Sequence, residues 1–173
     1  MLLVLGIAAS STLDGHNDVL LWSDLVASFE RAIRFPPLSV YVGHQAGHCV
    51  GQVLKIQPDQ SSQEIRAILE IYNAGAAARV KAGTLKGISI CASGRIRRGL
   101  SFNIVSCGRA LELSLVDDPA NDRCRILAWS DPASGERWQA NEVRPPQPSE
   151  PRGGFMPKGL RFEVRPPRGT SGR

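Results

Sequence analysis

Short β-like runs rich in apolar residues recur through the first 130 positions, and residues 63–72 also show the alternation with a period of two that is typical of β-strands. Short runs of this kind lie at residues 2–8, 38–42, 50–56, 63–72, 85–92, 100–106, 109–116 and 123–129. Residues 63–72 also suit a helix by composition. Their alternation of Ile65, Ala67, Leu69 and Ile71 favours a strand. The pattern therefore predicts a chain that is mainly β.

Two segments have the pattern of helices instead. Residues 23–34 begin at Ser23, a plausible N-cap, and place three apolar residues four positions apart on one helical face: Leu25, Phe29 and Ile33. Residues 74–82 are rich in alanine and stop at Gly83, which suits a left-handed helix cap. Many short strands with two helices predict an α+β, mainly β fold, with a compact barrel-like core on which the helices pack.

Composition changes near residue 144. Residues 144–173 hold seven of the twelve prolines, five glycines, seven basic residues and two acidic ones. Their net charge of +5 equals that of the whole chain, so residues 1–143 are net neutral. A segment of this composition cannot bury enough apolar area to offset the entropy of ordering it. We expect a folded domain at 1–143 and a basic, Pro/Gly-rich, disordered tail at 144–173.

The charge distribution and the cysteines restrict the class of protein. A net-neutral domain argues against a fold that binds nucleic acid across its body, which leaves only the tail as a basic arm. No uninterrupted run of 18 apolar residues is present to span a membrane. The first residues lack the positive start of a signal peptide, so they are expected to form a buried strand. The four cysteines have no metal-site or redox spacing and are expected to be reduced and mostly buried: Cys49, Cys91, Cys107 and Cys124.

Histidine is the commonest general base near neutral pH, and the chain has three. His16 lies in a turn-like segment and is expected to be a solvated loop residue. His44 and His48 flank a glycine-rich turn between two predicted strands, from which a histidine can project into a cleft. Two histidines four apart bind a metal most readily on a helix, which these glycines disfavour, and no acidic cluster lies nearby. No metal site is expected.

A serine and a glutamate stand in unusual surroundings. Ser89 is centred in an apolar strand, where a lone serine is usually a tolerated small residue. Glu112 lies inside another predicted strand, where a buried carboxylate is costly unless it is paired. With His44, these residues would explain one another as nucleophile, base and orienting group. Composition alone does not show such a triad.

Four segments resemble, in order and spacing, the prohead (capsid-maturation) serine proteases of tailed bacteriophages, which share a fold with the herpesvirus assemblins. Residues 6–18 resemble the opening strand and its Asp-x-x-x-Asp stretch. His44 with Gly51 resembles the catalytic histidine with a glycine seven residues later, and residues 85–90 are similar to the Gly-x-Ser nucleophile strand. Residues 112–121 are similar to the Glu-x-Ser-x-Val-x-x-Pro-Ala-Asn signature, which is the most specific of the four.

The resemblance implies catalytic roles for His44, Ser89 and Glu112. Other groups could replace Glu112 as the third member, since assemblins use a second histidine there: Asp117, Asp118 or His48. Two positions depart from the family pattern. Cys91 stands where a glycine is frequent, and Gln45 stands where many members have an acid. Cys91 is a rival nucleophile on the face of Ser89, and we expect it to be a neighbour of the site. Backbone N–H groups of residues 118–122 are candidates for the oxyanion hole.

The implied function is a serine endopeptidase of phage head assembly that needs no cofactor. Its expected partners are the scaffold protein and the major capsid protein, whose scaffold-like leader it would cut, and self-cleavage and self-association are also expected. The implied location is the immature prohead in the bacterial host cytoplasm. Two alternatives remain: an inactive capsid-assembly factor of the same fold, and a small β-barrel module whose basic tail binds nucleic acid. The scarcity of aromatic residues in the strands argues against the second.

Overall fold

The computed structural model describes residues 1–33 and 37–140. Nine strands and two helices lie in these residues, so the mainly β class with packed helices is confirmed. No helix among them has the length and apolar character needed to cross a membrane. In chain order the elements are β1 (Leu2–Ser10), β2 (Asp18–Leu20), α1 (Trp22–Ile33), β3 (Ser39–Val42), β4 (Gly51–Asp59), β5 (Glu64–Ile71), α2 (Ala74–Lys81), β6 (Gly87–Arg97), β7 (Asn103–Val116), β8 (Ile126–Ser130) and β9 (Arg137–Gln139).

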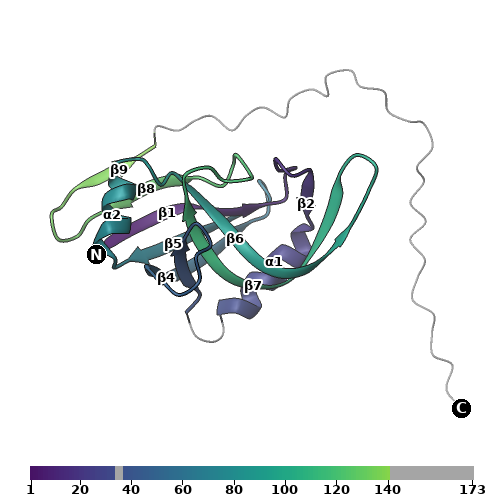
Figure 1. The fold of residues 1–173 in the computed structure, drawn as a ribbon, viewed down its shortest axis with the longest axis horizontal. Helices are drawn as coiled ribbons and strands as arrows, with labels where there is room; N and C mark the ends of the chain where they lie inside the picture. Colours follow the sequence, from purple (N-terminus) through teal and green to yellow (C-terminus); the bar gives the residue numbers. More distant parts are fainter. Residues whose placement is uncertain (34–36, 141–173) are drawn as a thin grey trace, which may run out of the picture. The chain divides into compact units, whose positions relative to one another are not determined.

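The strands form one sheet that closes on itself (Figure 1). Its order is β2-β7-β3-β4-β5-β1-β8-β9, and β6 pairs with β7. β2 and β3 run parallel to β7, whereas the other pairs are antiparallel. Closure comes from the second edge of β6: Gly87 bridges Arg125, and the Ile88 N–H donates to the Cys124 carbonyl at 2.9 Å. The first residues of β6 thus meet the segment that leads into β8, which makes the core a barrel.

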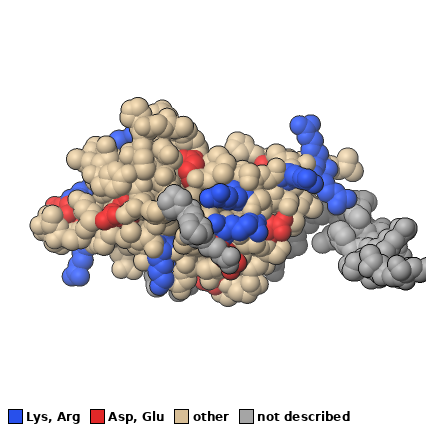
Figure 2. Space-filling view, turned by 90° about the horizontal axis from the view of Figure 1, so that it is seen from below, with Lys and Arg blue, Asp and Glu red and all other residues tan. Residues whose placement is uncertain are grey.

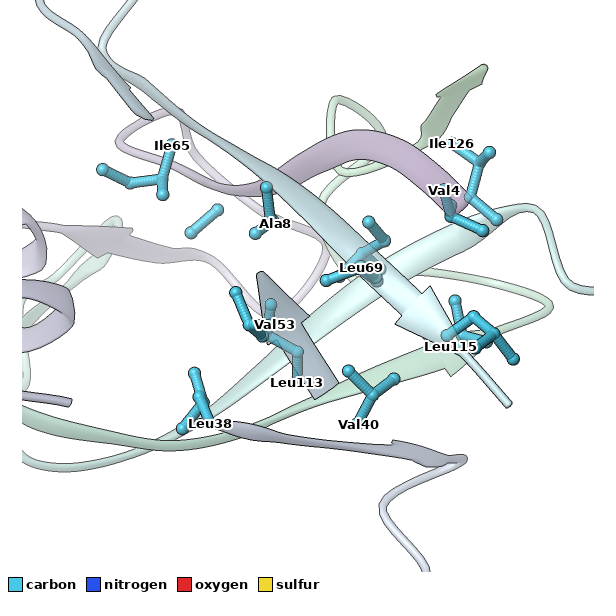
Figure 3. Packing of buried hydrophobic residues seen from close by; sticks show 14 of the residues in the cluster. Val4, Ala8, Leu38, Val40, Val53, Ile65, Leu69, Leu113, Leu115 and Ile126 are labelled. Atoms are coloured by element: carbon cyan, nitrogen blue, oxygen red, sulfur yellow. The ribbon is translucent and has the colours of Figure 1, made fainter. Parts of the chain in front are cut away.

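Inward-facing side chains from all sides of the sheet fill the barrel (Figure 3). The alternation predicted for residues 63–72 is confirmed by β5, whose Ile65, Leu69 and Ile71 are fully buried. Helix α1 packs against β7 through Leu25 and Phe29, which are also buried. The same core therefore fixes the register of β5 and β7.

Where α1 begins is set by β2, a strand that the sequence pattern did not predict. β2 pairs with β7, and the N–H of the next residue, Leu21, donates to the Val105 carbonyl at 3.1 Å. The Leu21 carbonyl then accepts the first helical bond, so the helix starts at Trp22. Ser23 therefore lies inside the first turn, and its prediction as N-cap was wrong. Ile33, expected on the buried face, is 47% exposed.

Strand β7 replaces two predicted strands. Residues 100–106 and 109–116 were expected to be separate because Gly108 lies between them. In the structure Gly108 is part of one 14-residue strand, and Arg31 of α1 donates from Nε to its carbonyl at 2.8 Å. The β6–β7 register shifts between Ser93 and Gly94, so Gly108 forms a bulge in the strand rather than a break. β9 was also not predicted, and the strand expected at 123–129 begins only at Ile126.

All four cysteines are free thiols. Cys107 and Cys124 are buried, whereas Cys49 and Cys91 are exposed, so the expectation of mostly buried cysteines was wrong for half of them. Burial raises the pKa of the Cys124 thiol to about 12 and also raises the pKa of Cys107. These two thiols are therefore poor nucleophiles.

The domain boundary expected at residue 143 and the tail at 144–173 lie outside the described residues. Every strand pair of the barrel lies before residue 140, whose N–H donates to the Leu127 carbonyl at 2.8 Å. We predict that a chain ending at Asn141 unfolds cooperatively, with a Tm within about 4 °C of the full-length value. Thermal circular dichroism measures this. A truncated chain without a cooperative transition would show that the core needs residues beyond 141.

Candidate active site

The register of β6 and β7 gathers polar groups on the outer face of the barrel. Ser89 lies opposite Ser114, and Cys91 lies opposite Glu112. Opposed residues and residues two apart share a face, so all four point the same way. That face is the outer one because Ile88, at the alternate position, is fully buried in the core. Core packing thereby places a hydroxyl and a carboxylate on one surface.

His44 reaches this face from a tight turn after β3. Gly43 and His44 both have a φ of 58°, and the Gln45 N–H donates to the Val42 carbonyl at 3.2 Å. A positive φ is uncommon outside glycine and persists only where neighbouring structure holds it. Here the His44 N–H donates to the Ser114 hydroxyl oxygen at 3.0 Å. The turn thus directs the imidazole over the β6–β7 pair.

The three residues singled out from the sequence form one hydrogen-bonded chain. His44 Nε2 lies 2.9 Å from Ser89 Oγ, and His44 Nδ1 lies 2.5 Å from Glu112 Oε1. A carboxylate only accepts hydrogen bonds, so Nδ1 carries the proton and donates it. In the neutral ring Nε2 is then the acceptor of the Ser89 hydroxyl proton. The imidazole side chain is 41% exposed and the Glu112 side chain 13%, so the imidazole is open to solvent while the carboxylate is largely covered.

Ser114 forms hydrogen bonds with both His44 and Glu112, although the sequence alone assigned it no role. Its hydroxyl donates to Glu112 Oε2 at 3.2 Å while accepting the His44 backbone N–H. Ser114 is 0% exposed despite its outward direction, which places it beneath the His44 turn. Its position two residues after Glu112, in the segment that resembles the protease signature, is the sequence feature from which a role in the site could have been predicted.

Other candidates for the third member do not contact His44. The Asp117 carboxylate accepts the Asp118 N–H at 3.1 Å, and no hydrogen bond joins either acid or His48 to the His44 ring within the described residues. Cys91 shares the face of Ser89 and is exposed, but the Nε2 partner is the serine. Across residues 1–33 and 37–140, no three His, Cys, Asp or Glu side chains converge as a metal site would require.

The loop after β7 packs beside the serine. A Cβ atom on Gly87 would lie 2.7 Å from the Pro119 ring, so only glycine lets the loop approach β6 this closely. The Ala120 carbonyl accepts the Gly15 N–H at 2.7 Å, and Asn121 Nδ2 donates to the Thr12 carbonyl at 3.2 Å. The Pro-Ala-Asn part of the signature therefore anchors this loop to β6 and to the segment after β1.

A cleft of about 300 Å³ lies between the end of β1, the segment that follows it, β6 and this loop. Ser89 forms part of its wall. The rest combines small or apolar residues with the polar residues Asp14, His16, Asp18 and Asn121; the apolar ones include Ala8, Ala9, Ile88, Ile90, Val105 and Ala120. The apolar part of this lining suits an apolar side chain of a bound peptide.

Two carboxylates of the cleft build its wall. Asp14 Oδ1 accepts the backbone N–H groups of His16 and Asp18 at 2.8 and 2.9 Å. Asp18 Oδ1 accepts from Asn103 Nδ2 at 2.8 Å. The Asp-x-x-x-Asp stretch thus shapes the segment before β2 and ties it to β7, and His16 lies in this exposed turn as expected.

No protein-family model matches this chain, and no curated protein sequence matches it. Among solved structures it is similar to the protease of the herpesvirus KSHV, determined in complex with a hexapeptide phosphonate inhibitor. The two are 16% identical with a TM-score of 0.48, over 76% of this chain and 66% of the protease chain. This chain therefore spans slightly less than two thirds of that protein. Similarity at this level shows neither a shared family nor a shared activity.

The contact between Gly87 and Pro119 gives a prediction about stability. Gly87→Ala should lower the free energy of unfolding by about 1–3 kcal/mol, because the added methyl group overlaps the proline ring. The unchanged chain is the reference. Urea unfolding compares the two. Equal stabilities would mean that the loop does not press on β6.

The buried hydroxyl gives a second prediction for the site. Ser114→Ala leaves the His44 N–H without its acceptor and should cost about 1–3 kcal/mol of stability. The His44 ring should also be held less firmly against Glu112, because both partners lose their bond to Ser114, and ¹⁵N NMR of the imidazole reports this as shifted or broadened signals. Ser114→Cys, which restores a weak donor and acceptor, should recover part of both. Unchanged ring signals in Ser114→Ala would show that Ser114 does not position His44.

Proposed function

We propose that this chain is a serine endopeptidase, in which Ser89 is the nucleophile, His44 the general base and Glu112 the group that orients the imidazole. The observation that carries the proposal is the continuous chain from Ser89 Oγ through both nitrogens of His44 to the Glu112 carboxylate, with contacts of 2.9 and 2.5 Å. A hydroxyl is inert as a nucleophile until a base accepts its proton, and this arrangement supplies the base and fixes its tautomer.

The reaction follows from these contacts. As Ser89 Oγ attacks the carbonyl carbon of the scissile peptide, its proton passes to His44 Nε2. The imidazolium that forms is stabilised by the Glu112 carboxylate at Nδ1. Collapse of the tetrahedral intermediate breaks the C–N bond, and the leaving amine takes the proton from Nε2. A water molecule, deprotonated by the same nitrogen, then hydrolyses the acyl-enzyme and restores Ser89.

The loop after β7 is the source we propose for the oxyanion hole. Within the described residues, the backbone N–H groups of Ala120, Asn121 and Asp122 donate no intramolecular hydrogen bond. The side chain of Asn121 is occupied by Thr12 and by the Arg123 N–H, which fixes the loop. Preorganised donors of this kind stabilise the charge that develops on the carbonyl oxygen.

An extended substrate can pair with the open edge of β6. The Ile88 N–H points away from β7, toward Cys124. Backbone groups alternate sides along a strand, so the N–H and C=O of Ile90 point the same way, where no strand follows within the described part of the chain. A peptide added there would form main-chain hydrogen bonds beside Ser89 and fill the adjoining cleft.

The sequence resemblance supports a proposal about substrate and place. We propose that the enzyme cleaves scaffold protein or the scaffold-like leader of the major capsid protein, and also itself, inside an immature prohead in the bacterial cytoplasm. Packing of enzyme and substrate in one shell gives a high effective concentration. An open site with one modest cleft is sufficient under those conditions.

The nucleophile is tested by a pair of variants. Ser89→Ala should stop self-shortening and cleavage of a co-expressed scaffold, a loss of about 10⁴-fold or more, because the attacking oxygen is gone. Cys91→Ala should retain most of the activity, since Cys91 is exposed and has no bond to His44. Intact-mass spectrometry of each purified chain measures the cleavage.

Two outcomes would contradict this assignment. Activity that survives Ser89→Ala and disappears in Cys91→Ala would identify a cysteine protease. A wild-type chain that cleaves neither itself nor scaffold would favour the inactive assembly factor.

A further inference from the structure

Beyond the barrel, the β6–β7 hairpin continues as residues 94–102, all of which are exposed (Figure 1). We propose that these nine residues, here called the arm, dock an acidic, extended segment of the substrate at a distance from the scissile bond. The inference rests on the proposed protease function and adds to it a class of substrate: chains with carboxylates several residues away from the cleaved peptide.

The positive charge of the arm is the first observation that supports the proposal. Arg95, Arg97 and Arg98 lie within it, and none forms an ion pair among the described residues. No acidic residue occurs between positions 87 and 111. Figure 2 shows Lys and Arg side chains projecting at the right-hand end of the core, where Figure 1 places the tips of β6 and β7. Three uncompensated guanidinium groups so close together favour a partner rich in carboxylates.

Two carboxylates near the base of the arm are already engaged. Asp18 accepts from Asn103 Nδ2 at 2.8 Å, and Asp24 of α1 accepts from the Ser106 hydroxyl at 2.5 Å. Both bonds attach β7 to the core. The two carboxylates keep their charge, but neither forms an ion pair with an arginine of the arm among the described residues. The fold thus holds the arm in place without pairing its arginines.

Exposed apolar side chains accompany the arginines. Ile96 is 62% and Phe102 47% exposed, and Leu100 at the tip is fully exposed. Large apolar side chains next to unpaired arginines are characteristic of protein-binding surfaces, where the apolar groups provide contact area and the charges select the partner. A partner that alternates acidic and apolar residues matches this composition.

Continuity with the catalytic strand favours a peptide as the occupant. β6 carries Ser89 and then runs to Arg97, and from Ile90 onward its second edge has no strand partner in the described residues. At the rise of a β-strand, Ser89 and Arg95 are about 20 Å apart. A peptide paired with this edge would pass Ser89 and reach the arginines about six residues later. Nucleic acid cannot pair with a strand edge, and Phe102 is the one aromatic residue of the arm.

The test measures binding with the full-length Ser89→Ala chain, so its result does not depend on catalysis. The probe is a fluorescein-labelled ten-residue peptide of alternating glutamate and alanine, and its glutamine counterpart is the neutral control. Fluorescence anisotropy over a salt series should show that the glutamate peptide binds at least about tenfold more tightly, with an affinity that falls as salt rises.

Matched variants separate the arm from the basic C-terminal residues. Replacing Arg95, Arg97 and Arg98 together with glutamine should weaken binding by about fivefold or more and flatten the salt dependence. Replacing Arg161, Arg165 and Arg168 with glutamine removes the same charge and should change affinity less than about twofold. As a further check, Arg95→Glu with Arg97→Glu should shift the preference to a lysine–alanine peptide.

Hydrogen exchange locates the bound peptide: amides between Ile90 and Arg97 should become protected. Equal losses in the two triple variants, or protection confined to other segments, would overturn the proposal. So would a ten-residue oligothymidylate that binds more tightly through the same arginines, because the arm would then be a nucleic-acid site. Binding as expected in a chain that shows no Ser89-dependent cleavage would keep the arm and overturn the protease function alone.

Discussion

The pairing register between β6 and β7 is the constraint on which the site depends. Ser89 and Glu112 share the outer face because Ile88 and Leu113, at alternate positions, are fully buried inside the barrel. A slip of one residue would turn the hydroxyl and the carboxylate to opposite faces and would expose the core-facing apolar side chains of one of the two strands. The free energy of core burial therefore also positions the nucleophile and the acid. No further interaction is needed to bring them to the same face. The same long hairpin extends into the arm, so one element carries the serine and the proposed docking residues.

His44 is held differently, by a strained turn and one buried hydroxyl. Its positive φ is held by the turn hydrogen bond from Gln45 and by the bond from the His44 N–H to the Ser114 hydroxyl. The Ser114 hydroxyl both donates and accepts a hydrogen bond, so this buried polar group is paired and adds rigidity rather than cost. Positioning through Ser114 links the imidazole to the carboxylate before any substrate arrives, which is the kind of preorganisation that acyl transfer requires.

Much of this could be predicted from the sequence, and what could not has a common cause. Local alternation was enough to predict β5. The order and spacing of the motifs around His44, Ser89 and Glu112 were enough to propose that these residues meet. β2 was missed because three residues form a strand only through parallel pairing with β7. Gly108 was predicted to end a strand, because a glycine is a usual strand boundary and the sequence does not show that Arg31, far away in the chain, binds its carbonyl. The role of Ser114 and the exposure of the arm follow from the tertiary structure, which a local sequence pattern does not show.

The central claim is that His44 and Glu112 make Ser89 a nucleophile. Reaction of the full-length chain with an organofluorophosphate, followed by peptide mapping, tests it most directly, because this reagent reports an activated serine without a substrate. We expect one adduct per chain, on Ser89, abolished by His44→Ala and slowed by Glu112→Gln. An adduct on another residue, or labelling of Ser89 that His44→Ala leaves unchanged, would contradict the account.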